Sequence, residues 1–192
     1  PGGLRTSLRA PARLPGSLRA SSGVPTLEDM ASPLLHSAEV GHLELGAFRA
    51  WVPAPALDEA LGLSRRLCRR MRGRVLWNVS STARGGGVAE LLRPLLSYVR
   101  GAGIDARWMI LAGSHDFFVA TKSLHNALHG GDARGHGLSA EDRALYEDTT
   151  LKNAEELAAL ARPGDVVLLH DPQTAGMVPY LSRLGALVIW RC

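Results

Sequence analysis

The segment that decides the fold is "VLWNVSSTARGGGVAELL", residues 75–92. Its apolar start, Val75–Val79, has the length and residue types of a buried strand. Three consecutive glycines, Gly85, Gly86 and Gly87, follow a short polar stretch, and glycine permits backbone conformations and close approaches that other residues do not. From Val88 the leucines recur at helical spacing until Arg100. The segment therefore predicts a strand, a glycine loop and a helix in direct succession.

The rest of the chain repeats this alternation of strands and helices. Further strands are predicted at residues 104–113, 165–173 and 186–192, and further helices at residues 58–72, 117–129, 141–161 and 175–184. The helix at 141–161 begins at "SAED", where Ser139 and Asp142 have the spacing of a capping box. Strands with continuous apolar runs that alternate with helices are typical of a parallel sheet buried on both faces. The predicted fold is an α/β domain with a parallel sheet and helices on both of its faces.

Composition excludes several classes of protein. The chain is 46% hydrophobic and 21% charged, and no apolar run approaches the roughly 18 residues of a membrane span, so we expect no membrane partner. The pI is 9.6, yet half of the net charge of +4 comes from residues 1–29. The remainder has no basic stripe interleaved with aromatics, so we expect no nucleic-acid partner. Residues 1–29 are rich in Arg, Ser, Pro and Gly, which predicts disorder or an upstream leader sequence.

Polar residues gather where the predicted strands end. The first strand ends at Asn78 and Ser80, the third at His170, Asp171 and Gln173, and the fourth at Arg191. Ligands of open parallel α/β sheets bind outside these carboxyl ends. The glycine loop before a helix N-terminus favours a phosphate or another anion. Two plainer interpretations stay open: a tight turn without a ligand for the loop, and a strand cap for the histidine and aspartate.

The predicted helix at 117–129 carries a polar stripe formed by Lys122, His125, Asn126 and His129. A solvated surface is the ordinary interpretation of such a stripe. His125 and His129 have the i, i+4 spacing of metal ligands, but neither a general-base glutamate nor a third ligand accompanies them. The two cysteines form no metal motif and no disulfide framework. The sequence therefore predicts neither a metal nor a cofactor.

Five ordered segments together resemble one protein family. They are "NVSSTARGGGVAELL", "GIDARWMILAG", "FFVATKSLHNALHG", "DVVLLHDPQTAG" and "VIWRC". They are similar to trehalose synthases, retaining GT-B glycosyltransferases that make trehalose from a nucleotide-activated glucose, and to related trehalose phosphorylases. The resemblance covers residues 75–192, is loose over the lead-in and surface helix of 34–74, and is absent over the leader, 1–33. It implies the N-terminal Rossmann-like half of a GT-B glycosyltransferase.

The resemblance also implies a site. Gly85, Gly86 and Gly87 would meet the phosphates of a nucleotide-glucose donor. The glucose acceptor would face six residues: His170, Asp171, Gln173, Lys122, His125 and Asn126. The family continues beyond "WRC" into a second Rossmann-like domain, so the chain is expected to be a fragment that is inactive alone, and no catalytic residue is assigned within it. The implied location is cytoplasmic.

Three alternatives stay open beside this interpretation. The first is a fragment of a trehalose phosphorylase, and the second is a non-catalytic α/β domain that binds a nucleotide or another anion. The third concerns assembly, because a homodimer is also compatible with the sequence. Neither the nucleobase of the donor nor the choice between synthase and phosphorylase follows from these residues.

Overall fold

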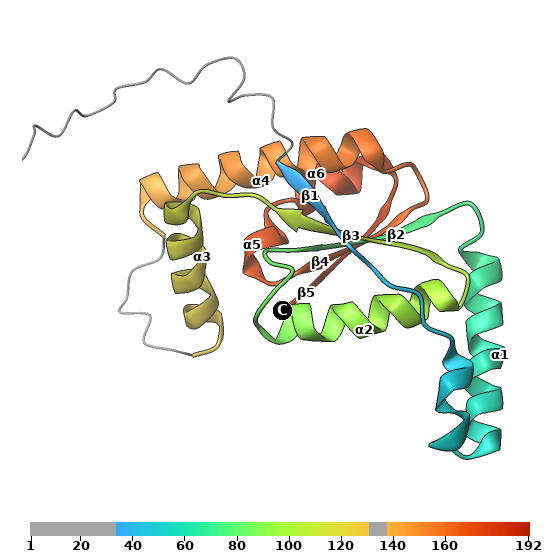
Figure 1. Ribbon diagram of the computed structural model, residues 1–192. Helices are drawn as coiled ribbons and strands as arrows, with labels where there is room; N and C mark the ends of the chain where they lie inside the picture. The colour runs from blue at the N-terminus through green and yellow to red at the C-terminus, as the bar shows by residue number, and fades with distance from the viewer. Residues whose placement is uncertain (1–33, 131–137) are drawn as a thin grey trace, which may run out of the picture. The chain divides into compact units, whose positions relative to one another are not determined.

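The sheet has five strands in the order β1-β3-β2-β4-β5 (Figure 1). The strands are β1 (Leu35–Ala38), β2 (Val75–Ser80), β3 (Asp105–Leu111), β4 (Val166–His170) and β5 (Leu187–Arg191). Strands β2 to β5 pair in parallel, whereas β1 runs antiparallel to β3 at one edge. This computed structural model describes residues 34–130 and 138–192. The four parallel strands predicted from sequence are confirmed.

Strand β1 was not predicted, and tertiary contacts hold it in place. Its sequence, "LHSA", is four residues long and lacks the apolar run of the other strands. The backbone N–H groups of Leu34 and Leu35 donate to the two carboxylate oxygens of Glu156, each at 2.8 Å. Glu156 lies 121 positions beyond Leu35 in the sequence, so no local pattern could reveal this contact.

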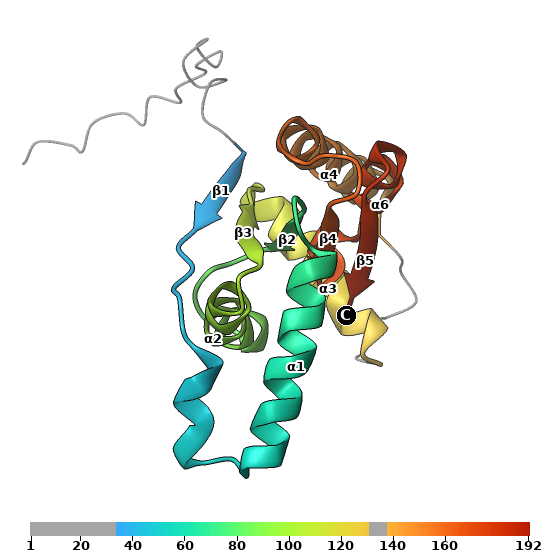
Figure 2. The same ribbon diagram turned by 90° about the vertical axis from the view of Figure 1, so that its right-hand side faces the viewer.

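Helices cover both faces of the parallel strands (Figures 1 and 2). One face packs against α4 (Ala140–Leu160) and α6 (Val178–Leu181), and the other packs against α2 (Gly87–Gly101). Helix α3 (His115–Leu128) lies beyond the carboxyl end of β3, and α1 (Ala54–Arg70) precedes β2 with the 3₁₀ helix η1 (Leu45–Ala50). The two-sided α/β fold is confirmed.

The single helix predicted over residues 175–184 is wrong. The chain instead forms α5 (Pro172–Ala175), α6 and the 3₁₀ helix η2 (Ser182–Leu184). The break falls at Gly176, whose N–H donates to the Tyr146 hydroxyl at 2.8 Å. A Cβ at Gly176 would lie 2.5 Å from the Thr150 hydroxyl oxygen, so α4 packs directly on this backbone. Close packing against α4 therefore interrupts a pattern that reads locally as one helix.

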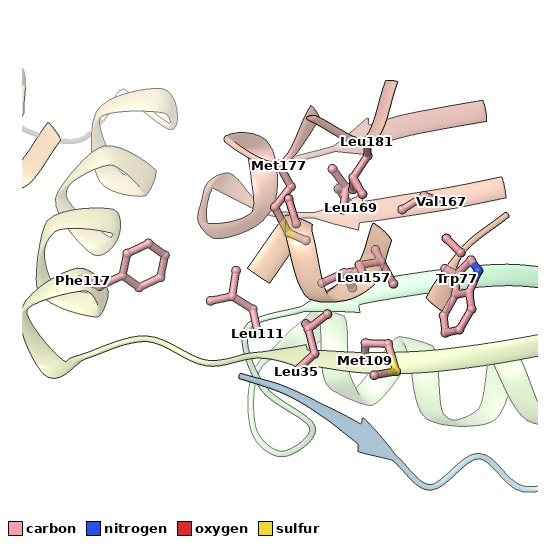
Figure 3. Close-up of a cluster of buried hydrophobic side chains, with 13 residues drawn as sticks. Leu35, Trp77, Met109, Leu111, Phe117, Leu157, Val167, Leu169, Met177 and Leu181 are labelled. Atoms are coloured by element: carbon pink, nitrogen blue, oxygen red, sulfur yellow. The ribbon is translucent and has the colours of Figure 1, made fainter. Parts of the chain in front are cut away.

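Two apolar clusters, one on each face of the sheet, form the core. Figure 3 shows the larger cluster, in which Trp77 and Leu169 from the strands pack with Leu157 of α4. On the opposite face Trp108 of β3 packs with Leu92 and Leu96 of α2. Each fully buried leucine contributes roughly 1.5–3 kcal/mol, so these contacts fix α2 and α4 on the sheet. The loops at the carboxyl ends of the strands are thereby held in place.

Several smaller expectations can be compared with the structure. The surface helix predicted at 58–72 is α1, and among its residues only Leu57 is buried. The Ser139 hydroxyl accepts from the Asp142 N–H at 3.0 Å, as the capping spacing predicted. No helix among the described residues is long and apolar enough to cross a membrane. The prediction of a disordered or upstream leader, 1–33, falls outside the described residues.

Candidate functional site

A pocket of about 490 Å³ opens at the carboxyl ends of β2, β4 and β5. The loop after β2, the start of α2, one side of α3 and the turn after β4 form its walls. Its lining comprises Ser80, Ser81, Thr82, Gly85, Gly86, Gly87, Val88, Ala89, Leu91, Lys122, His125, Asp171, Gln173 and Arg191. This volume lies within the range of small-molecule sites.

The pocket brings together most of the residues that the sequence analysis selected. All three glycines line it, and so do Lys122, His125, Asp171 and Gln173. Two selected residues do not line it. His170 is buried, with 1% of its surface exposed, and Asn126 is exposed on α3 outside the lining.

The glycine loop owes its shape to backbone conformation and to hydrogen bonds. Gly85 has φ 70° and Gly86 has φ 85°, values that side-chain-bearing residues rarely adopt. The Thr82 hydroxyl donates to the Arg84 carbonyl at 2.7 Å and accepts from the Arg84 N–H at 3.1 Å. A Cβ added at any of the three glycines would meet nothing within 4 Å. Two glycines are therefore required by conformation, and all three leave the backbone open to the pocket.

Helix α2 begins at the pocket wall with no side-chain cap. Its N-cap is Gly86, and no side chain accepts from the first N–H groups of the helix. The first hydrogen bond within the helix runs from the Glu90 N–H to the Gly86 carbonyl at 3.2 Å. The N–H groups of Gly87, Val88 and Ala89 therefore have no acceptor within the helix. Free N–H groups and the positive end of the helix dipole favour an anion here.

Asp171 has an unusual backbone conformation. Its φ of 65° and ψ of 169° lie in a region that is essentially restricted to glycine, and it is the only non-glycine residue with positive φ among those described. Four hydrogen bonds hold its backbone: the N–H donates to the Arg191 carbonyl at 2.8 Å, and the carbonyl accepts from Trp190 Nε1 at 2.9 Å, from the Thr174 hydroxyl at 3.1 Å and from the Thr174 N–H at 3.2 Å. Strained residues of this kind cluster at functional sites.

His170 forms a buried pair with Asn78 beside Asp171. Its Nε2 lies 3.1 Å from Asn78 Oδ1, and both side chains are 1% exposed. Burial, with a smaller effect from the positive charge of Arg191, lowers the pKa of His170 to about 4. A neutral imidazole that donates from Nε2 leaves Nδ1 as an acceptor, and neither Nδ1 nor Asn78 Nδ2 has a partner among the described residues.

Comparison with known proteins identifies a family whose match covers this part of the chain. The sequence profile described as "Trehalose synthase, N-terminal domain" matches residues 78–192, which include every residue lining the pocket. The chain belongs to this family. Its resemblance to trehalose synthases and trehalose phosphorylases, inferred from five segments, is confirmed.

Individual relatives of the trehalose synthase family support the match. The chain is 37% identical over 161 residues to the trehalose synthase of Rubrobacter xylanophilus, an alignment that covers 83% of this chain and 37% of that protein. It is 39% identical over 135 residues to the trehalose synthase of Thermococcus litoralis, covering 70% of this chain and 32% of that protein. The trehalose phosphorylase of Pleurotus pulmonarius is 34% identical over 110 residues, covering 55% of this chain and 15% of that protein. The chain thus spans about a third of the length of these synthases.

Helix α3 contributes a cationic and an aromatic group to the pocket. Lys122 and His125 lie one turn apart on α3, and both line the pocket. The His125 ring stacks on the His129 ring with centroids 4.3 Å apart, and His129 Nδ1 lies 2.9 Å from the His125 carbonyl oxygen. The stacked pair fixes the orientation of His125 on the pocket side of the helix.

Arg191 was recognised from the sequence as the polar end of the fourth strand, but it was given no role in the predicted site. Arg191 ends β5 and lines the pocket, and its carbonyl accepts the N–H of Asp171. The rule that selected Asp171, a polar residue at the carboxyl end of a parallel strand, applies equally to Arg191. Arg191 and Lys122 supply positive charge to the pocket, whereas Asp171 and Gln173 supply hydrogen-bond acceptors. The arrangement suits a ligand that combines an anionic group with hydroxyl groups.

Proposed function

We propose that this chain supplies the acceptor side of a retaining glycosyltransferase that transfers glucose from a nucleotide-glucose to glucose and forms trehalose. One observation carries the proposal: a single pocket joins an uncapped helix N-terminus and glycine loop to a strained aspartate at the neighbouring strand end. The first feature suits a diphosphate and the second suits a sugar. Membership of the trehalose synthase family supports the same assignment.

On the donor side, the backbone at Gly85–Gly87 would contact the diphosphate of the nucleotide-glucose. The free N–H groups of α2 would stabilise the negative charge that develops on the leaving diphosphate. A helix terminus alone contributes roughly 0.3–1 kcal/mol per charge, so further donors are needed. Arg191 and Lys122 line the same pocket and would supply positive charge to the diphosphate.

On the acceptor side, Asp171 would accept hydrogen bonds from the hydroxyls of glucose, with the Gln173 amide beside it. The carboxylate of Asp171 makes no hydrogen bond with the side chains and backbone that the structure describes, so both oxygens are available. A carboxylate can accept from two hydroxyls at once. Gln173 lines the pocket, and its Oε1 has no partner among the described residues. Retention at the anomeric carbon is part of the proposal and follows from the family resemblance.

A trehalose phosphorylase activity is the second candidate, because three phosphorylases match 110 residues of this chain at 32–34% identity. Glucose 1-phosphate would then take the place of the nucleotide-glucose, and the same helix terminus would hold its phosphate. A non-catalytic anion-binding domain would bind a nucleotide at the loop without binding glucose. Titration with glucose, glucose 1-phosphate and nucleoside diphosphates therefore separates the three functions.

The experiment titrates the chain with ADP, UDP, glucose 1-phosphate and glucose, and ligand NMR detects binding. Gly87→Val should weaken nucleotide binding at least about tenfold, because a branched side chain at an ordinary φ would cover the free N–H groups without straining the backbone. Gly86→Val is a poorer choice, since φ 85° would strain any side chain. Gly46→Val, which also meets open space, is the matched control. Unchanged nucleotide binding by Gly87→Val would contradict the donor assignment.

The acceptor assignment is tested in the same titrations. Asp171→Ala should weaken glucose binding while leaving nucleotide binding nearly unchanged, and Asp58→Ala on α1 is the control. The isolated 192-residue chain should form no trehalose from nucleotide-glucose and glucose, because transfer requires both substrates in one closed cleft. Trehalose formation by this chain alone would refute the proposal that it supplies only the acceptor side of the enzyme.

A further inference from the structure

A second polar pocket lies at the opposite edge of the sheet from the glycine loop. Its volume is about 510 Å³, and it is formed at the amino ends of β2, β3 and β4. Figure 1 shows the α1–β2 connection at this edge and α3 beyond the other edge. The pocket is in the size range of small-molecule sites. No residue of the site proposed for glucosyl transfer lines it.

Four arginines line this amino-end pocket, and they come from separate parts of the chain. Arg72 and Arg74 precede β2, Arg107 belongs to β3, and Arg162 follows α4. Four guanidinium groups around one hollow repel each other unless counter-charges balance them. The acidic residues of the lining are Asp105 and Asp165.

Both aspartates are already engaged by other groups. Asp105 accepts from Arg107 Nε at 3.1 Å and from Arg107 Nη2 at 2.8 Å, and this pairing lowers the pKa of Asp105. Asp165 is 2% exposed and accepts from the Val75 N–H at 2.8 Å, the Arg162 N–H at 2.9 Å and Trp77 Nε1 at 3.0 Å. Burial opposes ionisation of Asp165, but these hydrogen bonds hold its pKa below the usual value. Both carboxylates are therefore ionised, and their oxygens already accept hydrogen bonds from other groups.

The guanidinium groups of three exposed residues, Arg72, Arg74 and Arg162, make no hydrogen bond and no ion pair within 4.0 Å among the described residues. The positive charge of Arg162 does help to lower the pKa of Asp165, but the oxygens of that carboxylate are occupied by other donors. Arg107 is held by Asp105 and by Trp77, with its guanidinium carbon 5.0 Å from the indole centroid. The paired N–H donors of a guanidinium group match the geometry of two phosphate oxygens, and this pocket is lined by several guanidinium groups. Met71, Val75 and Leu160 add apolar walls beside them.

We propose that this amino-end pocket binds the phosphate group of a small phosphomonoester, with Arg74 and Arg162 as the principal ligands of the phosphate. These two arginines approach from different elements, one before β2 and the other after α4. A bound phosphate would balance the excess of positive charge, and the apolar walls would contact the remainder of the molecule. The site is independent of the proposed glucosyl transfer.

The pocket contains its own reporter, the Cys68 thiol, which lines it and donates to the Gly103 carbonyl at 3.3 Å. The chain has only two cysteines, so Cys192→Ser leaves Cys68 as the single thiol. A phosphate bound nearby would cover this thiol and slow its alkylation. The assay is the rate of alkylation by neutral iodoacetamide, followed by mass spectrometry at ionic strength fixed with sodium chloride.

Glucose 6-phosphate, AMP and inorganic phosphate are the three probes. We expect one or both esters to slow the alkylation of Cys68 saturably, by at least about threefold. The double variant Arg74→Gln/Arg162→Gln should weaken the apparent affinity for the ester at least about tenfold, because each lost hydrogen bond involves a charged group. The ester that protects at lower concentration identifies the group beyond the phosphate. Protection by inorganic phosphate equal to that by both esters would overturn the phosphomonoester assignment.

Control variants separate this site from general charge and from the glycine-loop pocket. Arg143→Gln removes an exposed arginine on α4 that does not line this pocket, and Lys122→Gln alters the other pocket. Both should keep full protection of Cys68, and circular dichroism verifies the fold of every variant. The proposal is overturned if no probe slows alkylation, if the arginine variants keep wild-type protection, or if the controls lose it equally.

Discussion

The strained backbone of Asp171 makes a quantitative prediction about stability. Asp171→Gly and Asp171→Ala both remove the carboxylate, so the difference between them isolates the cost of φ 65° and ψ 169°. A side-chain-bearing residue in such a region costs about 1–3 kcal/mol. Glycine loses about 0.5–1 kcal/mol more conformational entropy than alanine on folding. With the middle values of these ranges, the free energy of unfolding of Asp171→Gly should therefore be about 1 kcal/mol higher than that of Asp171→Ala, and at most about 2.5 kcal/mol higher.

The assay is urea unfolding followed by circular dichroism, with thermal unfolding as a second measurement. For a domain of this size each kcal/mol shifts the melting temperature by about 2–4 °C. The control is the same pair of substitutions at Asp58, which lies inside helix α1, where alanine should be the more stable by about 1 kcal/mol. The sign of the glycine–alanine difference is thus expected to reverse between the two positions.

One result would refute this reasoning. If Asp171→Ala is as stable as Asp171→Gly, the backbone at this position is unstrained or relaxes freely, and strain gives no reason to place function there. If the predicted sign is found and Asp171→Gly is also more stable than the wild type, the aspartate is present although a more stable residue exists for this position. The carboxylate then has a role other than stability, which agrees with its place in the proposed acceptor site.

Two further predictions concern His170 and the glycines. Burial and the charge of Arg191 lower the pKa of His170 from 6.5 to about 4. Between these two pH values the unfolded chain binds a proton at His170 and the folded chain does not. The free energy of unfolding should therefore fall by up to about 1.4 kcal/mol per pH unit as the pH decreases from 6.5 to 4. Urea titrations across this range test the slope, and a slope unchanged in His170→Gln would assign it to other groups. A Cβ at Gly101 would collide with the Leu43 carbonyl, so Gly101→Ala should lower the free energy of unfolding by about 1–3 kcal/mol. Gly62→Ala, inside α1, should instead raise the free energy of unfolding by about 0.5–1 kcal/mol. Chemical denaturation of both variants measures the contrast, and equal effects would contradict the packing described at Gly101.

The sequence by itself determined the parallel strands and the glycine loop. The run Val75–Val79 and the leucines of α2 reflect local periods, and a buried strand or an amphipathic helix requires those periods whatever its neighbours are. Asp171 and Gln173 could be selected because the carboxyl ends of parallel strands converge at one edge. The placement of these residues in one pocket with the glycines follows from this general rule of sheet geometry.

Only the tertiary structure decided the remaining features. Strand β1 is held by its antiparallel pairing with β3 and by Glu156 of α4, whose carboxylate accepts from the N–H groups of Leu34 and Leu35. His170 lies beneath the pocket rather than in its lining because strand alternation turns it toward Asn78 on the neighbouring strand. The conformation of Asp171 depends on bonds from Arg191 and Trp190 of β5, some twenty residues later. Such contacts join residues that are distant in sequence, and no local pattern encodes a conformation that distant partners impose.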